Sequence, residues 1–148
     1  MARILQLVAL TAAMCVAAAC TDDVLDASYP DQSAAVAAGA IERGWIPSWI
    51  PPEATQLREV HNVDTNQSAL LFSLPPQSTW APPRECAPAV AGQFSEPAFS
   101  RDWIPDIEQG YDLFACPGER ASAQPQLYAG LAVSRNRLQV FHWRVLAR

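Results

Sequence analysis

The chain has 148 residues, half of them apolar, and its ten basic and fifteen acidic residues give a formal net charge of -5. A chain of this length can form one domain with a core of its own, and its apolar content argues against general disorder. A negative domain lacks the broad positive field that attracts phosphates, so a nucleic-acid-binding protein is disfavoured.

The first residues predict a secretory signal over 1–19. Arg3 is followed by an apolar run that ends in small residues, and the polar residues 21–23 come next. A charged start, a short apolar core and a small-residue exit are typical of a signal peptide. About 18 apolar residues can also span a bilayer. Gln6, Thr11 and the many alanines favour a segment that is removed.

The exit of the run, Val16-Ala17-Ala18-Ala19-Cys20, resembles the lipobox of bacterial lipoprotein precursors, although Ala17 stands where that class prefers Leu. The resemblance covers only the first twenty or so residues. It implies that the Cys20 thiol takes a diacylglycerol and that the chain is cut just before it. The chemistry needs a thiol because the thiolate is the nucleophile.

Lipidation of this kind implies a membrane partner and a location in the cell envelope. Several acyl chains anchor a protein stably, because each buried methylene contributes about 0.8 kcal/mol. Thr21 follows the cysteine, and by resemblance to enterobacterial lipoproteins this implies the inner leaflet of the outer membrane, facing the periplasm. Residues 20–30 are then expected to be a tether with a reach of about 35 Å, followed by a single globular domain over 31–148.

The four cysteines are consistent with this placement. Cys15 leaves with the signal and Cys20 carries lipid, so Cys86 and Cys116 remain. Two remaining thiols in an oxidising compartment predict one disulfide. A catalytic or metal-binding role for them lacks any CxxC spacing.

The stretch DQSAAVAAGAIERG predicts a short helix. Asp31 or Ser33 can cap its start and Gly44 can end it. The face expected to cover a sheet carries Val36, Ala37, Ala40 and Ile41.

The triplet Trp-Ile-Pro occurs at 45–47, 49–51 and 103–105. The prolines exclude a regular helix or a central strand there. One interpretation is a set of stiff corners whose indoles plug the ends of the core. The alternative is a platform on which cell-wall sugars stack, with Trp45 and Trp49 as contact residues.

Segments 55–63 and 68–74 flank Asp64-Thr65-Asn66-Gln67 and predict a hairpin over 55–74, because Asn tolerates the positive φ of a tight turn. A turn at Thr65-Asn66 places His61 opposite Leu70 and Glu59 opposite Phe72. Glu59 and His61 then share a face. They could form a general-base pair or half of a metal site, but an ion pair on the strand surface is the simpler interpretation.

Residues 75–100 are rich in proline and long for a loop in a small domain, and such loops are usually functional or disordered. Cys86 would hold the middle of this loop through its disulfide. Trp80, between two Pro-Pro pairs, is the residue we expect to be an exposed contact.

Strands resume at Tyr111, and a second hairpin is predicted over 127–146 with its turn at Arg135-Asn136. That turn pairs Gly130 with Phe141, as part of an aromatic face, and Ala129 with His142. Both faces of the hairpin are mostly apolar, which predicts a place in the middle of the sheet. His142 is then expected to be a core histidine with its hydrogen bonds satisfied.

Together these elements predict an α+β fold, in which the N-terminal helix packs on an antiparallel sheet of about five strands. The stretch from Gly44 to Asn66, GWIPxxIPPxAxxLxExHxxDTN, is also similar to a pattern in uncharacterised proteobacterial envelope and membrane proteins. This resemblance implies no activity.

No catalytic, phosphate-binding or metal-binding motif occurs, and no cofactor or metal is expected. The leading hypothesis is a non-catalytic module that binds an envelope protein or peptidoglycan, or that organises the envelope. Two alternatives stay open at this point. One is a cell-wall hydrolase that uses Glu59, His61 and Asp64, and the other is an inhibitor of a periplasmic enzyme.

Overall fold

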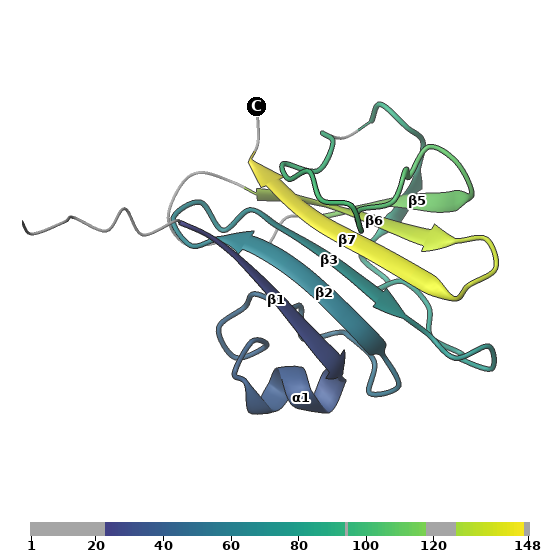
Figure 1. Cartoon of the computed structure of the whole chain (residues 1–148). Coiled ribbons are helices and arrows are strands. Elements are labelled where there is room, and N and C mark those ends of the chain that lie inside the picture. Colours follow the sequence, from purple (N-terminus) through teal and green to yellow (C-terminus); the bar gives the residue numbers. More distant parts are fainter. Residues whose placement is uncertain (1–22, 94, 118–126, 147–148) are drawn as a thin grey trace, which may run out of the picture.

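The computed structural model describes residues 23–93, 95–117 and 127–146, and these form one antiparallel sheet of seven strands (Figure 1). The order across the sheet is β1-β2-β3-β7-β6-β5-β4. In chain order the elements are β1 (Val24–Asp31), α1 (Gln32–Ala37), β2 (Thr55–Asn62), β3 (Ser68–Ser73), β4 (Ala87–Ala89), β5 (Tyr111–Cys116), β6 (Leu127–Ser134) and β7 (Gln139–Leu146).

The α+β prediction is wrong, because the described part of the chain is almost entirely β and α1 has only six residues. The sequence predicts strands at the positions of β2, β3, β5, β6 and β7, but not the two edge strands, β1 and β4. Val24–Pro30 of the expected tether therefore lies in the sheet. Both edge strands contain a proline, Pro30 or Pro88, which suits an edge because proline cannot donate to a further strand.

The helix begins where expected and ends early. The Asp31 carboxylate caps it by accepting the Ala34 N–H at 2.9 Å. Gly39 adopts a φ of 72°, and Ala40 N–H then donates to the Ala35 carbonyl. This is a Schellman termination, which stops the helix soon after it starts. The predicted covering face is right for Ala40, which is buried, and for Ile41, which packs against the core. It is wrong for Val36 and Ala37, which are exposed, and Ala35 is buried instead.

The two hairpins occupy the predicted ranges with different registers. In β2–β3, Glu59 lies opposite Leu70 and His61 opposite Ser68, so the connection is longer than a two-residue turn. Asn62 organises this connection, because its side-chain oxygen accepts hydrogen bonds from Asp64 and Thr65. A side chain that folds back onto its own backbone in this way replaces the tight turn.

The β6–β7 register is shifted by two residues from the prediction, so each side chain keeps its expected face but changes its partner. Gly130 pairs with Trp143 instead of Phe141. A β-carbon on Gly130 would lie 2.1 Å from the Trp143 ring, so glycine is required there. The hairpin lies mid-sheet, as predicted, with β7 between β3 and β6.

Each face of the sheet is covered, which gives two apolar cores. We call the face that carries Leu57, Leu70 and Val140 the helix face, because α1 and the Trp-Pro segment 45–54 pack on it. The opposite face carries Val60 and Phe141 and is covered by Phe99 and other residues of segment 99–107, so we call it the loop face. The polar side chains discussed below are placed by this alternation of faces.

The predicted disulfide is present between Cys86 and Cys116, with an S–S distance of 2.05 Å. It joins the start of β4 to the end of β5 and so fastens the proline-rich loop to the sheet. Cys20 lies outside the described residues. Within the described ranges, no helix has the length and apolar character that crossing a membrane requires.

Candidate functional site

Glu59 and His61 form a pair that is buried, in contrast to the expected ion pair on a strand surface. The His61 Nδ1 atom lies 3.0 Å and 2.9 Å from the two carboxylate oxygens of Glu59. The side chains of His61 and Glu59 are 3% and 0% exposed. Both point to the helix face, since they are two residues apart on β2.

Neighbouring strands add two further polar side chains to this pair. His61 lies opposite Ser68, and Ser68 lies opposite Arg144, so the three residues cross β2, β3 and β7 in one row. Arg144 Nε donates to the Ser68 hydroxyl at 2.7 Å, and Nη2 donates to the Gly44 carbonyl at 2.8 Å. All four side chains are buried, and we call them the polar row: Glu59, His61, Ser68 and Arg144.

The Trp-Pro segment covers the polar row. The Trp45 ring stacks on His61, with centroids 4.2 Å apart and an angle of 20° between the rings. The Arg43 guanidinium lies 4.4 Å from the Trp45 centroid, which is a cation–π contact. Trp49 meets His142 edge to face, with centroids 5.3 Å apart. The first two Trp-Ile-Pro triplets therefore act as corners that close this part of the core.

Burial is the main cause of the pKa shifts of Glu59, in the polar row, and of His142, which lies near it on β7. Burial raises the pKa of the Glu59 carboxyl, while the hydrogen bond from His61 and the charges of His61 and Arg144 oppose the rise. Burial also lowers the pKa of His142 to about 3, with a further contribution from Arg144, so this imidazole stays neutral at physiological pH. Its Nδ1 has no hydrogen-bond partner among the described residues, contrary to the expected satisfied histidine.

The geometry brings together two residues of the hydrolase hypothesis, Glu59 and His61, and leaves Asp64 apart from them. His61 Nε2 is the atom that a general base would present to a substrate, but it is buried beneath Trp45. Asp64 is exposed in the β2–β3 connection. The linings of three grooves on the described surface contain none of Glu59, His61 and Asp64. The described residues also contain no cluster of three potential metal ligands.

Trp80 is partly buried on the helix face. It packs against Trp49 and Phe72, with ring centroids 5.9 Å and 6.0 Å away. Arg137 donates to its carbonyl at 2.8 Å and holds the loop in place. Trp45, Trp49 and Trp80 thus all contribute to the cover of one core, and their role as contact residues stays a prediction.

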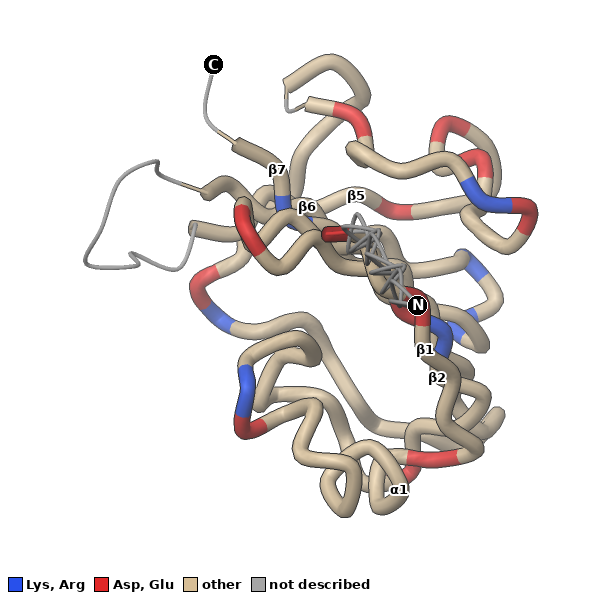
Figure 2. Tube along the Cα trace, turned by 60° about the vertical axis from the view of Figure 1, so that its left-hand side comes forward, with Lys and Arg blue, Asp and Glu red and all other residues tan. Residues whose placement is uncertain are grey.

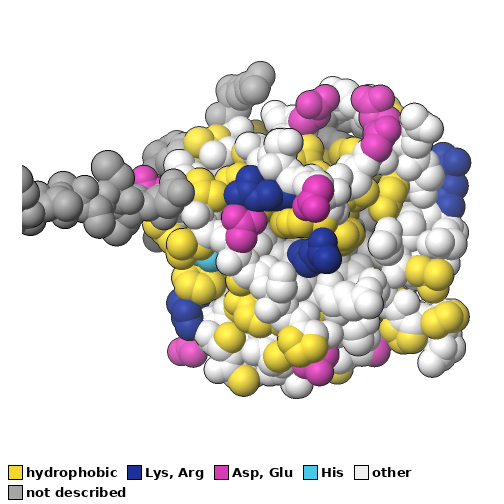
Figure 3. Space-filling view, viewed as in Figure 1, with side chains coloured by type: hydrophobic (Ala, Val, Ile, Leu, Met, Phe, Trp, Pro, Cys, Tyr) yellow, Lys and Arg dark blue, Asp and Glu magenta, His cyan; other side chains and the backbone are white. Residues whose placement is uncertain are grey.

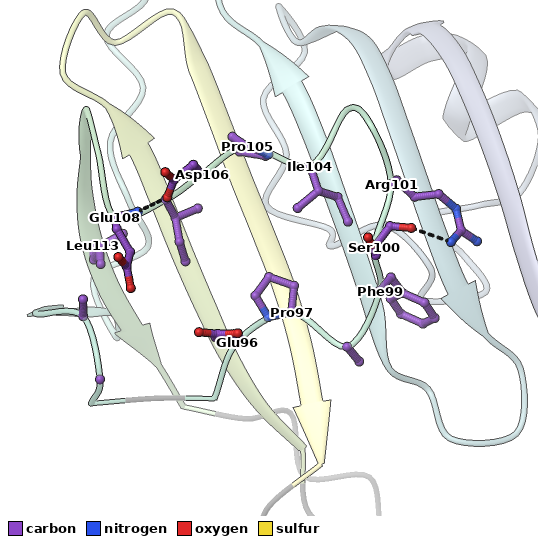
Figure 4. Close-up of a pocket in the computed structure, with 14 residues that line it drawn as sticks. Glu96, Pro97, Phe99, Ser100, Arg101, Ile104, Pro105, Asp106, Glu108 and Leu113 are labelled. Carbon is purple, nitrogen blue, oxygen red and sulfur yellow. Dashed lines mark hydrogen bonds between the residues drawn. The ribbon is translucent and has the colours of Figure 1, made fainter.

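A groove with a volume of about 680 Å³ lies on the opposite, loop face (Figure 4). Its walls come from the segment between β4 and β5, with Leu113 of β5 at one end. Apolar side chains form most of the lining, and carboxylates of Glu96, Asp106 and Glu108 stand beside them. We call this the acidic groove. Figure 3 shows acidic side chains beside hydrophobic ones on the surface above β5 to β7.

Arg101 fixes the far end of the acidic groove to the sheet. Its Nε and Nη2 atoms donate to the two carboxylate oxygens of Asp26 in β1, each at 2.8 Å. This hydrogen bond lowers the pKa of the Asp26 carboxyl. The segment that builds the groove is thereby held near its middle by Arg101, and the Cys86–Cys116 disulfide links the two strands that flank it. Arg101 is the one basic residue among the described residues that line the groove, and its guanidinium is thus already paired with Asp26.

Sequence reasoning did not single out the carboxylates of this groove. The signal that could have found them is a local excess of charge, because residues 96–112 contain five acidic residues and only Arg101 as a base. Figure 2 shows several red positions on the loops above β5. Charge alone, however, does not reveal that the segment folds over a sheet face.

Comparison with known protein families gives a match to part of the chain. Residues 23–73 match the family described as the YbbD head domain. These residues comprise β1, α1, the Trp-Pro segment, β2 and β3, which are three adjacent strands and the cover of their helix face. Comparison with curated proteins and with solved structures gives no match. The stretch that is similar to the YbbD head domain, residues 23–73, contains Glu59, His61 and Ser68 of the polar row.

Proposed function

We propose that this is a lipid-anchored envelope protein whose domain acts by binding a partner protein in the acidic groove. The observation that carries the proposal is the groove itself, a preformed hollow of about 680 Å³ built by the long segment between β4 and β5. Concave, largely apolar sites with a few convergent polar groups are typical of binding sites. The YbbD head-domain match is consistent with an envelope protein.

The lining defines the chemistry of the partner. Pro97, Phe99 and Ile104 offer an apolar surface. The nearby carboxylates form no ion pair with a described cation, because Arg101 is already paired with Asp26. Groups of opposite charge at the rim give specificity and a faster association. A basic segment with apolar side chains, exposed on an envelope protein, fits this arrangement.

The sheet also supports an anchor close to the membrane. If Cys20 carries the lipid, only residues 21–23 separate it from β1, a span of about 14 Å when extended. The end of the sheet where β1 begins then faces the bilayer. A partner of this domain is accordingly expected to be a membrane protein or a protein held near the same membrane.

The anchor predicts a defined mass for the mature protein. We expect the chain purified from cell envelopes to begin at Cys20 and to carry a diacylglyceryl group, with or without an N-acyl chain. Intact-mass spectrometry measures this, and Cys20→Ala is the matched control, expected to leave an unlipidated chain. An unmodified wild-type polypeptide that leaves spheroplasts in the soluble fraction would contradict the anchor.

The groove predicts that partner capture depends on its charge. We expect Asp106→Asn/Glu108→Gln to reduce capture about tenfold, since two exposed ion pairs at roughly 0.5–1 kcal/mol each correspond to that factor. The Asp106 carboxylate accepts the backbone N–H of Glu108, and the amide oxygen of the Asp106→Asn variant can still accept it. Chemical crosslinking in intact cells, followed by mass spectrometry, measures the yield of each partner.

The matched control is Glu42→Gln/Glu85→Gln, which removes the same charge from exposed positions outside the groove. We expect this control to leave the crosslinking pattern unchanged. Equal loss in the control and the groove variant would indicate a general effect of net charge. An unchanged pattern in both would exclude the acidic groove as the binding site.

A further inference from the structure

A second groove of about 700 Å³ lies on the loop face over β1, β2 and β3. Its chemistry differs from that of the acidic groove. Side chains of Gln56, Arg58, Ser73 and Gln139 line it, and the indole of Trp103 forms part of its wall. The third Trp-Ile-Pro triplet thus has a different setting from the first two, because its tryptophan borders an open groove.

A break in the strand pairing shapes this groove. The β2–β3 register shifts between Thr55 and Arg58, and Gln56 adopts a φ of 53°. Irregularities in strand pairing, such as β-bulges, change the direction in which side chains point and often lie next to functional sites. Here the irregularity brings Gln56 to the groove on the loop face.

Arg58 provides the charge of the groove. It lies opposite Ser28 and Leu71 in the sheet, it is exposed, and it makes no ion pair with any described residue. The acidic side chain nearest along β1, Asp26, is bound by Arg101. The guanidinium therefore keeps its hydrogen-bond donors available for a carboxylate.

The two glutamines leave donors rather than acceptors free. The side-chain oxygen of Gln56 accepts from the Ser73 hydroxyl at 3.2 Å. The side-chain oxygen of Gln139 accepts from the Tyr111 hydroxyl at 3.1 Å. Each amide NH₂ group then has no partner among the described residues, so the groove presents a surface of donors to a ligand rich in acceptors.

We propose that this groove binds a sugar that carries a carboxylate. Trp103 offers an apolar ring face, the amides donate to hydroxyl and carbonyl oxygens, and Arg58 pairs with the acid group. A polyanion is disfavoured, because the described residues give the groove one free cation, on a chain with a net charge of -5. The inference uses a different groove from the proposed partner site and does not depend on it.

The test compares ligands that differ by the carboxylate. The probes are N-acetylmuramic acid, which bears a lactyl carboxylate, and N-acetylglucosamine, which has the same ring without it. They are titrated into the full ¹⁵N-labelled chain in detergent micelles. We expect N-acetylmuramic acid to bind at least fivefold more tightly and to shift the Trp103 indole and the Gln56 and Gln139 amide signals.

Variants separate the contributions. Arg58→Gln is expected to remove the preference for the acid while the neutral sugar binds as before. Trp103→Phe is expected to weaken the binding of both sugars several-fold, because phenylalanine offers a smaller aromatic face. Arg84→Gln, at an exposed arginine outside the groove, is the matched control and should change neither titration.

Glucuronic acid, as a third probe, distinguishes the source of the carboxylate. Tighter binding of N-acetylmuramic acid indicates a cell-wall glycan, and tighter binding of glucuronic acid indicates an acidic polysaccharide; either result supports the proposal. Equal affinity for acidic and neutral sugars, or signals that shift outside the groove, would overturn it. So would an acid preference that survives in Arg58→Gln.

Discussion

Replacing His61 with leucine is expected to destabilise the domain by about 3–5 kcal/mol at neutral pH, the cost of removing one partner from a buried charged pair. The Glu59 carboxylate has a fully buried side chain, and its hydrogen bonds in the described structure are to His61. The His61→Leu variant leaves that carboxylate unpaired beneath Trp45. Chemical denaturation followed by tryptophan fluorescence measures the loss.

The same variant has a predicted pH dependence. Because burial raises the Glu59 pKa above its ordinary value of 4.5, the folded chain holds this proton more tightly than the unfolded chain. The resulting stabilisation is complete below pH 4.5 and is lost as the pH rises through the raised pKa. Removing His61 raises that pKa further. We therefore expect His61→Leu to cost less at about pH 5 than at about pH 8.

The control for this prediction is the double variant Glu59→Met/His61→Leu. Replacement of a whole buried pair by apolar side chains of similar volume is often neutral or stabilising. We expect the double variant to be more stable than His61→Leu alone and to lose the added pH dependence. Glu59→Met and His61→Leu, measured singly, could instead each lower the free energy of unfolding by under about 1 kcal/mol. If these two losses also sum to the loss in the double variant, the pair does not act as a unit.

Removing the disulfide is expected to have an effect of similar size. Cys86→Ser/Cys116→Ser removes a crosslink between residues 30 apart in sequence. By its effect on the entropy of the unfolded chain, such a crosslink contributes about 3–4 kcal/mol to the free energy of unfolding. We expect the midpoint of thermal unfolding to fall by about 10 °C or more. Circular dichroism measures the midpoint, and a reducing agent should reproduce the loss in the wild type.

The double variant itself provides the control, because a reducing agent should not lower its midpoint further. The structure also predicts where the loss begins. β4 has three residues at an edge of the sheet, and the disulfide is next to it. Hydrogen exchange should therefore increase first around β4. A midpoint that changes by less than about 2 °C would show that the loop is held by packing alone.

Local patterns determine those elements whose signal lies within a few residues. Alternation and turn residues predict the five inner strands, and the central position of the β6–β7 hairpin follows from its two apolar faces. Counting the cysteines predicts the disulfide. Asp31, one of the two residues predicted as the helix cap, is the cap in the structure, because a cap depends on contacts within one turn.

Edge strands, registers and sites depend on contacts between distant segments. The segment of β1 has little alternation and so resembles a tether, and it is a strand only because β2 offers hydrogen-bond partners. The β6–β7 register is decided by the contact of Gly130 with Trp143, not by its turn. Helix length is set by Gly39, where the chain turns toward the core.

The candidate sites show the same division. The sequence by itself placed Glu59 and His61 on one face of one strand, and it marked Trp103 as part of a repeated triplet. Only the tertiary structure buried the first pair beneath Trp45 and left Trp103 beside an open groove with Arg58. The physical reason is that burial and charge pairing are properties of neighbours in space, and the segments that provide those neighbours lie far away along the chain.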